Sequence, residues 1–590
     1  MNQTIAHLNS LWGQLIVEEL IRNGGDYFCI SPGSRSTPLT VAVARNPRSR
    51  YVIAYDERGA AFHALGYARA TGKPAVLICT SGTAVANYFP AVVEASVDHL
   101  PVIIISADRP PELRETGANQ TIRQTHLFGD YLKWRFELPV PDEHISPRMV
   151  LTTIDQLCYQ AQTCPPGPVH LNCPFREPFL PEDQKSVPLR HQDLEHWLTT
   201  NQSFTFYSTH QVTPGAKTMD RAAQLLAGSK NCLLVAGRLH NPTDADAVLQ
   251  LSRDLGLPLF ADITSGLRLS NQSDTIIHYF DQMLLSGKFH EKLLPDLVVQ
   301  FGNQPVSKRW LQLLEKHPPE NFIGVQRHPY RQDPAHRVTL RIESDIARFC
   351  KVLQTSMTGS PHPGDTYRNT LRSLSLKIGE LLAEELHPDC PLSDIAVARQ
   401  LTCIIPAEQA LFLASSMPVR EMDMVGCPGS NVSVAANRGA SGIDGTVASA
   451  VGYAVGANAP VTLFIGDLAL LHDLNSLTLL SALPVPVILV VINNHGGGIF
   501  SFLPIAGARD IFDTFFATPH RWNFSHIAEM FDLAYFFPGT TREFVHAYRQ
   551  AQRQQGHTLI EVQTDRGETT KFHKQLQMRI RQLIDQFMNE

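Results

Sequence analysis

Val461-Thr-Leu-Phe-Ile-Gly-Asp467 is an apolar run that ends in Gly-Asp, and Val487-Ile-Leu-Val-Val-Ile-Asn-Asn494 is a second apolar run that ends in Asn-Asn. Asn494 stands 27 residues after Asp467, which leaves room for one helix between two parallel strands. The carboxyl ends of such strands share one edge of the sheet, where open α/β folds bind their ligands. Carboxylate and amide oxygens are ligands that Mg²⁺ takes together with water and substrate phosphates. The spacing therefore predicts a strand–helix–strand unit that holds a metal-bridged diphosphate.

Short apolar runs separated by helix-length segments recur along the chain, which is the βα rhythm of a doubly wound sheet. We expect three consecutive doubly wound parallel-sheet α/β domains, at residues 1–185, 205–355 and 366–590. A polar, proline-containing passage at 181–214 and a Ser-, Pro- and Gly-rich stretch at 355–365 separate them. The expected strands are 27–30, 51–54, 75–79, 102–105 and 169–172 in the first domain, 233–236, 257–260, 297–301 and 322–325 in the second, and 411–414, 432–434, 463–465, 487–492 and 558–562 in the third.

The composition is that of a soluble globular chain of two to four domains. The 590 residues are 43% hydrophobic and 18% charged, with a net charge of −6, so the basic balance that nucleic-acid binding needs is missing. No apolar run approaches the roughly 20 residues that span a bilayer. Residues 1–24 do not show a signal-peptide pattern, so we expect a cytoplasmic protein. The ten cysteines occur singly, without zinc-site spacing, and we expect free, buried thiols.

A second motif gives the diphosphate pattern a chemical meaning. Tyr55-Asp-Glu-Arg-Gly59 follows a short apolar run, and together with the Gly-Asp…Asn pattern it resembles the signature of thiamine diphosphate enzymes. The resemblance implies that Glu57 bonds the aminopyrimidine ring and favours its imino tautomer. It also implies that the first domain binds the pyrimidine, the third binds the diphosphate and the middle one is mainly structural. Taken alone, Glu57 would be an ordinary acid at a helix start and Asp467 an ordinary turn residue.

Five further segments narrow the resemblance. Ile30-Ser-Pro-Gly-Ser-Arg-Ser-Thr-Pro38, Thr80-Ser-Gly-Thr-Ala-Val-Ala-Asn87, Ser106-Ala-Asp-Arg-Pro-Pro-Glu-Leu113, Gly117-Ala-Asn-Gln120 and Asn437-Arg-Gly-Ala-Ser-Gly-Ile-Asp-Gly445 stand in the order found in the 2-succinyl-5-enolpyruvyl-6-hydroxy-3-cyclohexene-1-carboxylate synthase family. The likeness covers about residues 10 to 565. It implies a transferase of menaquinone or phylloquinone biosynthesis. Such an enzyme decarboxylates 2-oxoglutarate and adds the resulting succinyl-semialdehyde carbanion to isochorismate in a 1,4-addition.

The resemblance also assigns the cofactor site. It implies Mg²⁺ or Mn²⁺ held by the side chains of Asp467 and Asn494 and by the main-chain carbonyl of Gly496. Leu468 stands where the wider superfamily has a glycine, and Ile443 matches the residue wedged between the two cofactor rings. The full expected set that binds thiamine diphosphate is Glu57, Thr80, Ser81, Gly82, Ser416, Gly442, Ile443, Gly466, Asp467, Leu468, Asn494 and Ile499. His495 lies within the metal segment, and we expect a solvated loop residue there.

The substrates are inferred from basic residues that lie just beyond predicted strand ends, because a planar guanidinium group can bind a carboxylate with two hydrogen bonds. Ser416 and Arg420 resemble the pair that holds the distal carboxylate of 2-oxoglutarate. Ser34 is a candidate for moving the proton at the acceptor, so the expected catalytic residues are Glu57 and Ser34. The expected substrate-binding residues are Ser34, Arg35, Arg109, Asn119, Gln120, Lys308, Arg309, Ser416, Arg420, Arg438, Phe500 and Leu503.

The family places its active sites at a subunit interface, so we expect a homodimer, and a dimer-of-dimers tetramer built from it. Three other functions fit parts of the pattern. Another 2-oxo acid decarboxylase or carboligase, such as an acetohydroxyacid synthase, would want a small apolar donor pocket in place of Arg420 and Arg438. A non-catalytic relative would be expected to lack Glu57, Asp467 or Asn494. A nicotinamide-dependent oxidoreductase would need the GxGxxG fingerprint, which is absent.

Overall fold

The structure is a computed structural model that describes residues 2–182, 194–270, 273–357 and 365–590. Its contacts group the chain into two compact units. Unit 1 comprises residues 1–209, 437–459 and 469–485, and unit 2 comprises 210–436, 460–468 and 486–590. Parts of the expected separators, residues 183–193 and 358–364, lie outside the described residues. Within the described ranges no helix is long and apolar enough to cross a membrane.

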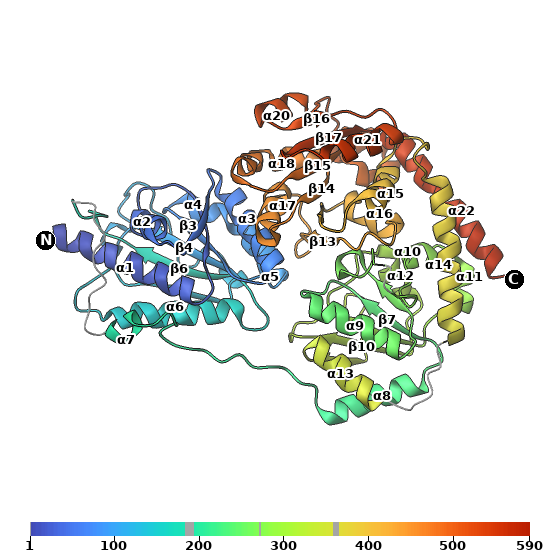
Figure 1. The fold of residues 1–590 in the computed structure, drawn as a ribbon, viewed down its shortest axis with the longest axis horizontal. Coiled ribbons are helices and arrows are strands. Elements are labelled where there is room, and N and C mark those ends of the chain that lie inside the picture. Colours follow the sequence, from blue (N-terminus) through green and yellow to red (C-terminus); the bar gives the residue numbers. More distant parts are fainter. Residues whose placement is uncertain (1, 183–193, 271–272, 358–364) are drawn as a thin grey trace. The chain divides into compact units, whose positions relative to one another are not determined.

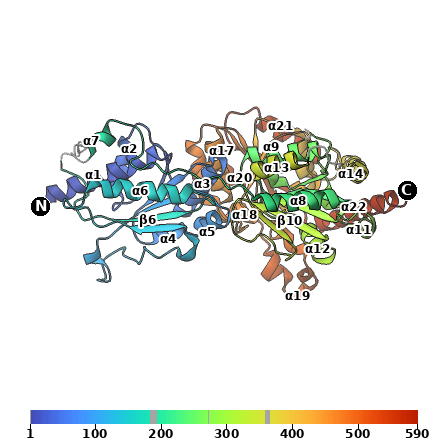
Figure 2. The ribbon, with the colours of Figure 1, turned by 90° about the horizontal axis from the view of Figure 1, so that it is seen from below.

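Unit 1 contains a six-stranded sheet in which every pair is parallel and the strand order is β2-β1-β3-β4-β6-β5. Strands β1 and β3 and the first four residues of β4 are continuous apolar runs, as expected of strands that are covered on both faces. Figure 2 shows α1 (Asn2–Arg22) and α6 (Pro147–Gln162) on one face and α4 (Thr83–Asn87) and α5 (Phe89–Val97) on the other. The strands are β1 (Tyr27–Ile30), β2 (Arg50–Ile53), β3 (Ala75–Cys79), β4 (Val102–Asp108), β5 (Trp134–Glu137) and β6 (Val169–Pro174).

Unit 1 also holds α17 (Thr446–Ala457), which packs along α3 (Glu57–Thr71). Glycines make this close crossing possible. A Cβ added at Gly66 would lie 2.0 Å from the carbonyl oxygen of Ser449, and one added at Gly452 would lie 2.0 Å from that of His63. Larger side chains would force the helices apart. The start of α3, which carries Glu57, is therefore fixed against a segment nearly 400 residues later in the chain.

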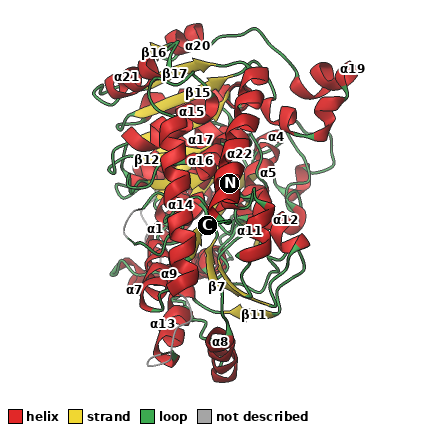
Figure 3. Cartoon of the chain, turned by 90° about the vertical axis from the view of Figure 1, so that its right-hand side faces the viewer, coloured by secondary structure: helices red, strands yellow, loops and turns green. Residues whose placement is uncertain are grey.

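Unit 2 contains two further parallel sheets. One has the order β13-β12-β14-β15-β17-β16, which repeats the topology of the sheet in unit 1, and the other has the order β11-β10-β9-β7-β8. The chain therefore contains three α/β parallel-sheet domains (Figure 1), as the sequence pattern predicts. Figure 3 shows β15, β16 and β17 side by side. The strands are β7 (Cys232–Ala236), β8 (Leu259–Ala261), β9 (Leu297–Phe301), β10 (Asn321–Gln326), β11 (Leu340–Glu343), β12 (Ala410–Leu413), β13 (Ser433–Ala436), β14 (Val461–Gly466), β15 (Val487–Asn493), β16 (Ala534–Phe536) and β17 (Thr558–Gln563).

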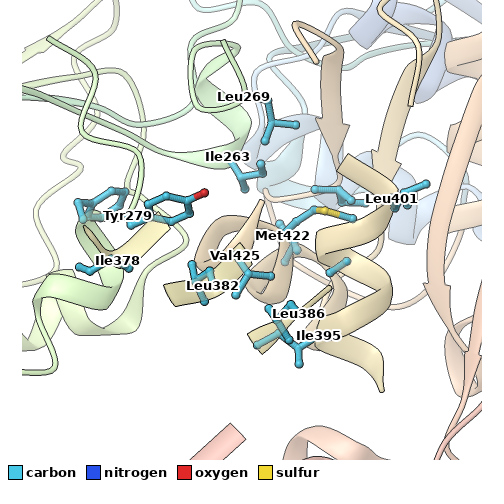
Figure 4. Packing of buried hydrophobic residues seen from close by; sticks show 14 of the residues in the cluster. Ile263, Leu269, Tyr279, Ile378, Leu382, Leu386, Ile395, Leu401, Met422 and Val425 are labelled. Carbon is cyan, nitrogen blue, oxygen red and sulfur yellow. The ribbon is translucent and has the colours of Figure 1, made fainter. Parts of the chain in front are cut away.

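One continuous apolar core joins the two sheets of unit 2. It is built by α10 (Phe280–Met283), α14 (Asp365–Glu385), α15 (Asp394–Ile404), α16 (Met417–Val425) and α22 (Arg566–Phe587). Figure 4 shows Ile263, Leu269 and Tyr279 facing Met422 and Val425, and Figure 1 shows α14 and α22 running side by side. Because these side chains are almost completely buried, the middle sheet and the third sheet share one hydrophobic core.

Some local features differ from the expectations. The expected strands overlap observed ones, but β5, β11 and β16 were not expected, and each lies at the edge of its sheet. The polar passage after residue 181 contains a buried anchor, because the indole N–H of Trp197 donates a 2.6 Å bond to Glu19. Seven of the ten free cysteines are buried, whereas Cys403 is exposed and Cys164 and Cys427 are half-buried.

Candidate functional site

The topology of the third sheet brings two predicted motifs to neighbouring strand ends. Strands β12 and β14 pair directly, while β13, which lies between them in sequence, pairs on the other side of β12. This arrangement is a topological switch point, the place where open α/β sheets bind ligands outside the carboxyl ends of their strands. Ser416 follows β12, and Gly466 and Asp467 stand at the end of β14.

Asp467 begins α18 (Asp467–His472) and is 2% exposed. Its Oδ1 accepts a 2.6 Å bond from the N–H of Leu468, and its Oδ2 accepts bonds from the N–H of Gly496 at 2.9 Å and from Nε2 of His520 at 3.1 Å. Burial raises the pKa of this carboxyl, while the two backbone N–H groups and His520 act in the opposite direction. A cation at this edge would favour the ionised form further.

Asn494 and Gly496 lie on the loop after β15, the next strand of the sheet. Oδ1 of Asn494 is buried and accepts no hydrogen bond within the described part of the chain. A buried amide oxygen without a donor is costly unless a ligand satisfies it. Gly496 has a φ of +140°, and an added Cβ would lie 2.2 Å from the carbonyl oxygen of Ala517. Its carbonyl accepts a 2.9 Å bond from the N–H of Gly498. The three predicted metal ligands thus lie on two adjacent loops.

His520 was missed by sequence reasoning, because it stands 53 residues from Asp467 on a segment without a motif. Its side chain is 3% exposed and stacks on Trp522. The ring of His495 packs edge-on against it at 5.5 Å, and a His495 ring nitrogen lies 2.6 Å from the amide of Gln563. The expectation of a solvated His495 is therefore wrong: the side chain is half-buried in this contact with His520.

Ser416 and Arg420 occupy the first turn of α16. Ser416 has a φ of +77°, an unusual value for a residue with a side chain, and its carbonyl accepts a hydrogen bond from the guanidinium of Arg420. The position of the Arg420 side chain therefore depends on the unusual backbone conformation of Ser416. Lys308 and Arg309 begin α12 (Lys308–Lys316), where Lys308 is exposed and Arg309 pairs with the buried carboxylate of Asp281.

Behind this edge lies a buried polar cluster that sequence reasoning also missed. Glu421 follows Arg420 and is 1% exposed, and burial raises its pKa to about 8. His573 lies 3.2 Å from it, and burial lowers the pKa of that imidazole to about 4. Burial thus opposes the charged form of both partners of this hydrogen bond. Asp394 lies beside both, and the side chain of Asn494 acts to lower its pKa, which burial raises to about 6.

In unit 1 the equivalent switch point lies between β1 and β3. The loops after these strands touch, because a Cβ added at Gly33 would lie 2.3 Å from Cβ of Thr80. Ser34 is exposed on the first loop, and Thr80, Ser81 and Gly82 form the second. Glu57 is half-buried at the start of α3, and its Oε2 accepts a 3.2 Å bond from Asn87.

Two of the predicted arginines lie close together at this edge. Arg35 is 6% exposed and bonds the carbonyl of Phe175 and the carboxylate of Glu177. Burial lowers the pKa of its guanidinium, and the nearby positive charge of Arg109 lowers it further. Arg109 donates to Ser81 and to the carbonyl of Gln120. Two guanidinium groups at one place favour an anionic ligand. Asn119 is exposed next to Gln120.

Residues 437–445, called here the arginine loop, join β13 to α17. Arg438 is half-buried, and Ile443, at the far end of the loop, is 36% exposed. The Cβ position of Gly442 is occupied by the carboxylate of Asp444 at 2.1 Å. The predicted apolar wall belongs to unit 2: Ile499 and Phe500 are half-buried and Leu503 is 36% exposed, and the ring of Phe500 packs on Phe516 at 5.8 Å.

Most of the predicted residues thus fall into two groups. In unit 1 the structure brings together Ser34, Arg35, Thr80, Ser81, Gly82, Arg109 and Gln120 around one sheet edge, and it places Glu57 and the arginine loop on the α3 and α17 side. In unit 2 it brings Gly466, Asp467, Leu468, Asn494 and Gly496 together and places Ser416 and Arg420 at the neighbouring strand end.

Family models match most of the chain. The description "Thiamine pyrophosphate enzyme, N-terminal TPP binding domain" matches residues 12–127, "Middle domain of thiamine pyrophosphate" matches 190–413, and "Thiamine pyrophosphate enzyme, C-terminal TPP binding domain" matches 426–562. The two outer matches cover both groups of candidate residues other than Ser416 and Arg420, which lie between the end of the middle match and the start of the C-terminal match.

Named relatives are similar over almost the full length. Proteins named 2-succinyl-5-enolpyruvyl-6-hydroxy-3-cyclohexene-1-carboxylate synthase from Rubrobacter xylanophilus, Chlorobium phaeobacteroides and Salinibacter ruber are 47%, 45% and 44% identical to this chain. The alignments cover 96%, 98% and 98% of this chain and 98%, 99% and 97% of those relatives. The chain therefore belongs to the 2-succinyl-5-enolpyruvyl-6-hydroxy-3-cyclohexene-1-carboxylate synthase family and is a thiamine diphosphate-dependent transferase.

Proposed function

We propose that this enzyme joins 2-oxoglutarate to isochorismate with loss of CO₂, as a step of menaquinone or phylloquinone biosynthesis. The full-length similarity to relatives that are named for the expected product carries the proposal. The distribution of guanidinium groups supports it, because both substrates are dicarboxylates and arginines stand at both switch points. A small apolar 2-oxo acid has no second carboxylate with which these arginines could pair.

The residues after β14 and β15 fit a divalent cation that bridges a diphosphate. Asp467 offers a buried carboxylate and Asn494 a buried oxygen that accepts no hydrogen bond from the described residues. Mg²⁺ or Mn²⁺ would be held by these two side chains and by the carbonyl of Gly496, all of them oxygen ligands of the hard type. His520 and the N–H of Gly496 fix the Asp467 carboxylate in place, which is the part that outer-shell partners play at metal sites.

Glu57 is proposed to hold the aminopyrimidine end of the cofactor. Its carboxylate is half-buried at the first turn of α3. Among the described residues Asn87 donates a side-chain hydrogen bond to Oε2, which leaves Oε1 for a ring nitrogen. When bound, thiamine diphosphate supplies the nucleophilic carbon and takes up the electron pair that stays behind when CO₂ leaves. Ile443, Gly442, Ile499 and the Thr80-Ser81-Gly82 turn complete the proposed cofactor contacts.

The donor and acceptor are proposed to use different arginines. Ser416 and Arg420, with Arg438, would hold the carboxylates of 2-oxoglutarate. Arg35, Arg109, Asn119, Gln120, Lys308 and Arg309 would face isochorismate, with Phe500 and Leu503 as an apolar wall. Holding both reactants in register can contribute roughly 7 to 11 kcal/mol to rate acceleration. Ser34 is exposed at the switch point of unit 1 and is proposed to move the proton at the acceptor.

We further propose that the enzyme works in the cytoplasm as a homodimer with its active sites at the interface, and that two dimers form a tetramer. The proposed domain boundaries are 1–185, 205–355 and 366–590. Light scattering of the purified protein, with and without thiamine diphosphate and Mg²⁺, tests the assembly. A monomer under all conditions would contradict it.

The activity itself is tested by mixing the protein with thiamine diphosphate, Mg²⁺, 2-oxoglutarate and isochorismate and identifying the product by mass. The succinyl adduct of isochorismate is expected. Release of CO₂ with isochorismate left intact would instead indicate a different 2-oxo acid decarboxylase, and the assignment of Arg35, Arg109 and Lys308 would be wrong.

A further inference from the structure

Glu94 is a charged residue at a buried position of α5, where its side chain is only 3% exposed. Its neighbours on the helix are mostly apolar, so the sequence offers no local reason for a carboxylate. A buried charge is tolerated only when it is paired and hydrogen-bonded. The partners of Glu94 therefore show what the residue does.

Two of those partners are consecutive backbone N–H groups of the arginine loop. Oε1 accepts a 2.8 Å bond from the N–H of Gly439, and Oε2 accepts a 2.5 Å bond from the N–H of Ala440. Each oxygen thus takes one donor from a segment 345 residues later in the chain. Bonds from N–H groups to a carboxylate are stronger than neutral ones. The contact is also close: a Cβ added at Gly439 would lie 2.7 Å from the carbonyl oxygen of Glu94.

Arg69 completes the arrangement from α3. It is buried, with its Nη2 3.6 Å from Glu94 and its Nη1 2.5 Å from Asp98. The same Nη2 donates a 3.3 Å bond to the side chain of Asn437, the first residue of the arginine loop. One guanidinium faces two carboxylates, and the second negative charge is balanced by the two loop N–H groups. Replacing Glu94 by glutamine would leave the two loop N–H groups facing a side-chain amide, which has one acceptor oxygen in place of two.

These contacts hold the backbone on both sides of Arg438. Asn437 is bonded to Arg69, and Gly439 is bonded to Glu94. The other end of the loop is fixed independently, because Gly445 has a φ of +63° and packs on the ring of Phe62, with its Cβ position 1.8 Å from the ring. We propose that Glu94 is a positioning residue that sets the arginine loop, and with it Arg438 and Ile443, for substrate and cofactor. This inference rests on the proposed function of those two residues.

The chain offers a matched control. Asp98 lies on the same helical stretch, is fully buried and pairs with the same guanidinium, so Asp98→Asn also removes one buried carboxylate from Arg69. It leaves the Glu94 bonds to Gly439 and Ala440 in place. Both substitutions should destabilise the protein, but only Glu94→Gln should loosen the arginine loop. Glu94→Asp keeps the negative charge but moves the carboxylate away from the loop N–H groups by the length of one methylene. It replaces Glu94→Gln in the test if Glu94→Gln does not fold.

Amide hydrogen exchange of the full-length protein without cofactor measures how firmly the arginine loop is held. Peptides covering residues 437–445 should exchange about tenfold faster in Glu94→Gln and Glu94→Asp than in wild type, because one charge-assisted bond is worth about that factor. The same peptides in Asp98→Asn should exchange at the wild-type rate. Equal exchange in all the proteins, or equal acceleration by Asp98→Asn, would overturn the proposal.

Steady-state kinetics separates this inference from the proposed function. Wild type should form the adduct, and Arg438→Met should raise KM for 2-oxoglutarate. Glu94→Gln should raise KM for 2-oxoglutarate or the Kd for thiamine diphosphate by about tenfold, with a smaller change in Asp98→Asn. An inactive wild type would refute the proposed function. An active wild type with a sensitive Arg438→Met, but with Glu94→Gln and Asp98→Asn indistinguishable, would refute the role of Glu94 alone.

Discussion

The main-chain N–H of Gly496 donates a 2.9 Å hydrogen bond to Oδ2 of Asp467, although 29 residues separate the two. This bond ties the loop after β15 to the end of β14, and those strands are neighbours in the sheet. It sets the carbonyl of Gly496 and the side chain of Asn494 on the same edge as the Asp467 carboxylate. Contacts within the protein therefore hold the proposed metal ligands at one edge of the sheet.

Asp467→Asn is predicted to remove the response of the protein to its cofactor. Thiamine diphosphate and Mg²⁺ at 100 times their Kd should stabilise wild type by about 2.7 kcal/mol, because a ligand that binds only the folded state shifts unfolding by mass action. The variant loses an anionic ligand, so its melting temperature should not change when both are added. Differential scanning calorimetry checks this, with the exposed Asp532→Asn as control. An equal shift in wild type and Asp467→Asn would contradict the metal assignment.

Gly496→Ala is predicted to be strained as well as inactive. The φ of +140° disfavours any side chain, and the new Cβ would meet the carbonyl oxygen of Ala517 at 2.2 Å. A cost of about 1 to 3 kcal/mol in the free energy of unfolding is expected. Gly507→Ala is the matched control, because no atom lies within 4 Å of its Cβ position. Urea denaturation of both variants gives the difference, and similar midpoints would show that Gly496 is not constrained.

Arg420→Lys is predicted to weaken the binding of 2-oxoglutarate. A lysine keeps the charge but loses the planar fork that can bind a carboxylate with two hydrogen bonds, and it also loses the contact to the carbonyl of Ser416. KM for 2-oxoglutarate should rise by about tenfold, and KM for isochorismate should change little. Arg372→Lys, on the exposed side of α14, is the control. A rise in KM for isochorismate alone would reassign Arg420 to the acceptor.

Glu19 is predicted to make stability pH-dependent. Burial, and then the adjacent Asp155, raise the pKa of this carboxyl to about 8. Because the folded state binds the proton more tightly than the unfolded state, the resulting stabilisation is complete below pH 4.5 and is lost as the pH rises through about 8. The melting temperature of wild type relative to Glu19→Gln should therefore fall between pH 5 and pH 9. A constant difference across this range would contradict the shift.

The central strands of all three sheets could be predicted from sequence, and so could the edge strands β2, β8 and β13, whereas the opposite edge strand of each sheet could not. Strands such as β3 and β15 are uninterrupted apolar runs because both faces are buried. The missed strands β5, β11 and β16 are short and mostly half-buried at the sheet edges. An edge strand needs less apolar surface and carries charged residues, so its pattern is close to that of a loop.

Some residues of the candidate site could likewise be predicted from sequence, and others could not. Asp467 and Asn494 could be placed together because strand order alone brings the ends of β14 and β15 to one edge. The partners His520 and Glu94 have no such signal. Each acts through a contact that forms only when segments 53 and 345 residues apart are packed, and no local pattern records that packing.

The measurement that tests the account most directly is product analysis with wild type and Glu57→Gln, assayed with thiamine diphosphate, Mg²⁺, 2-oxoglutarate and isochorismate. We predict that wild type consumes isochorismate and forms the succinyl adduct, and that Glu57→Gln, folded and similar in melting temperature, forms almost none. Adduct formation at an undiminished rate in Glu57→Gln, or no adduct with wild type, would contradict the account.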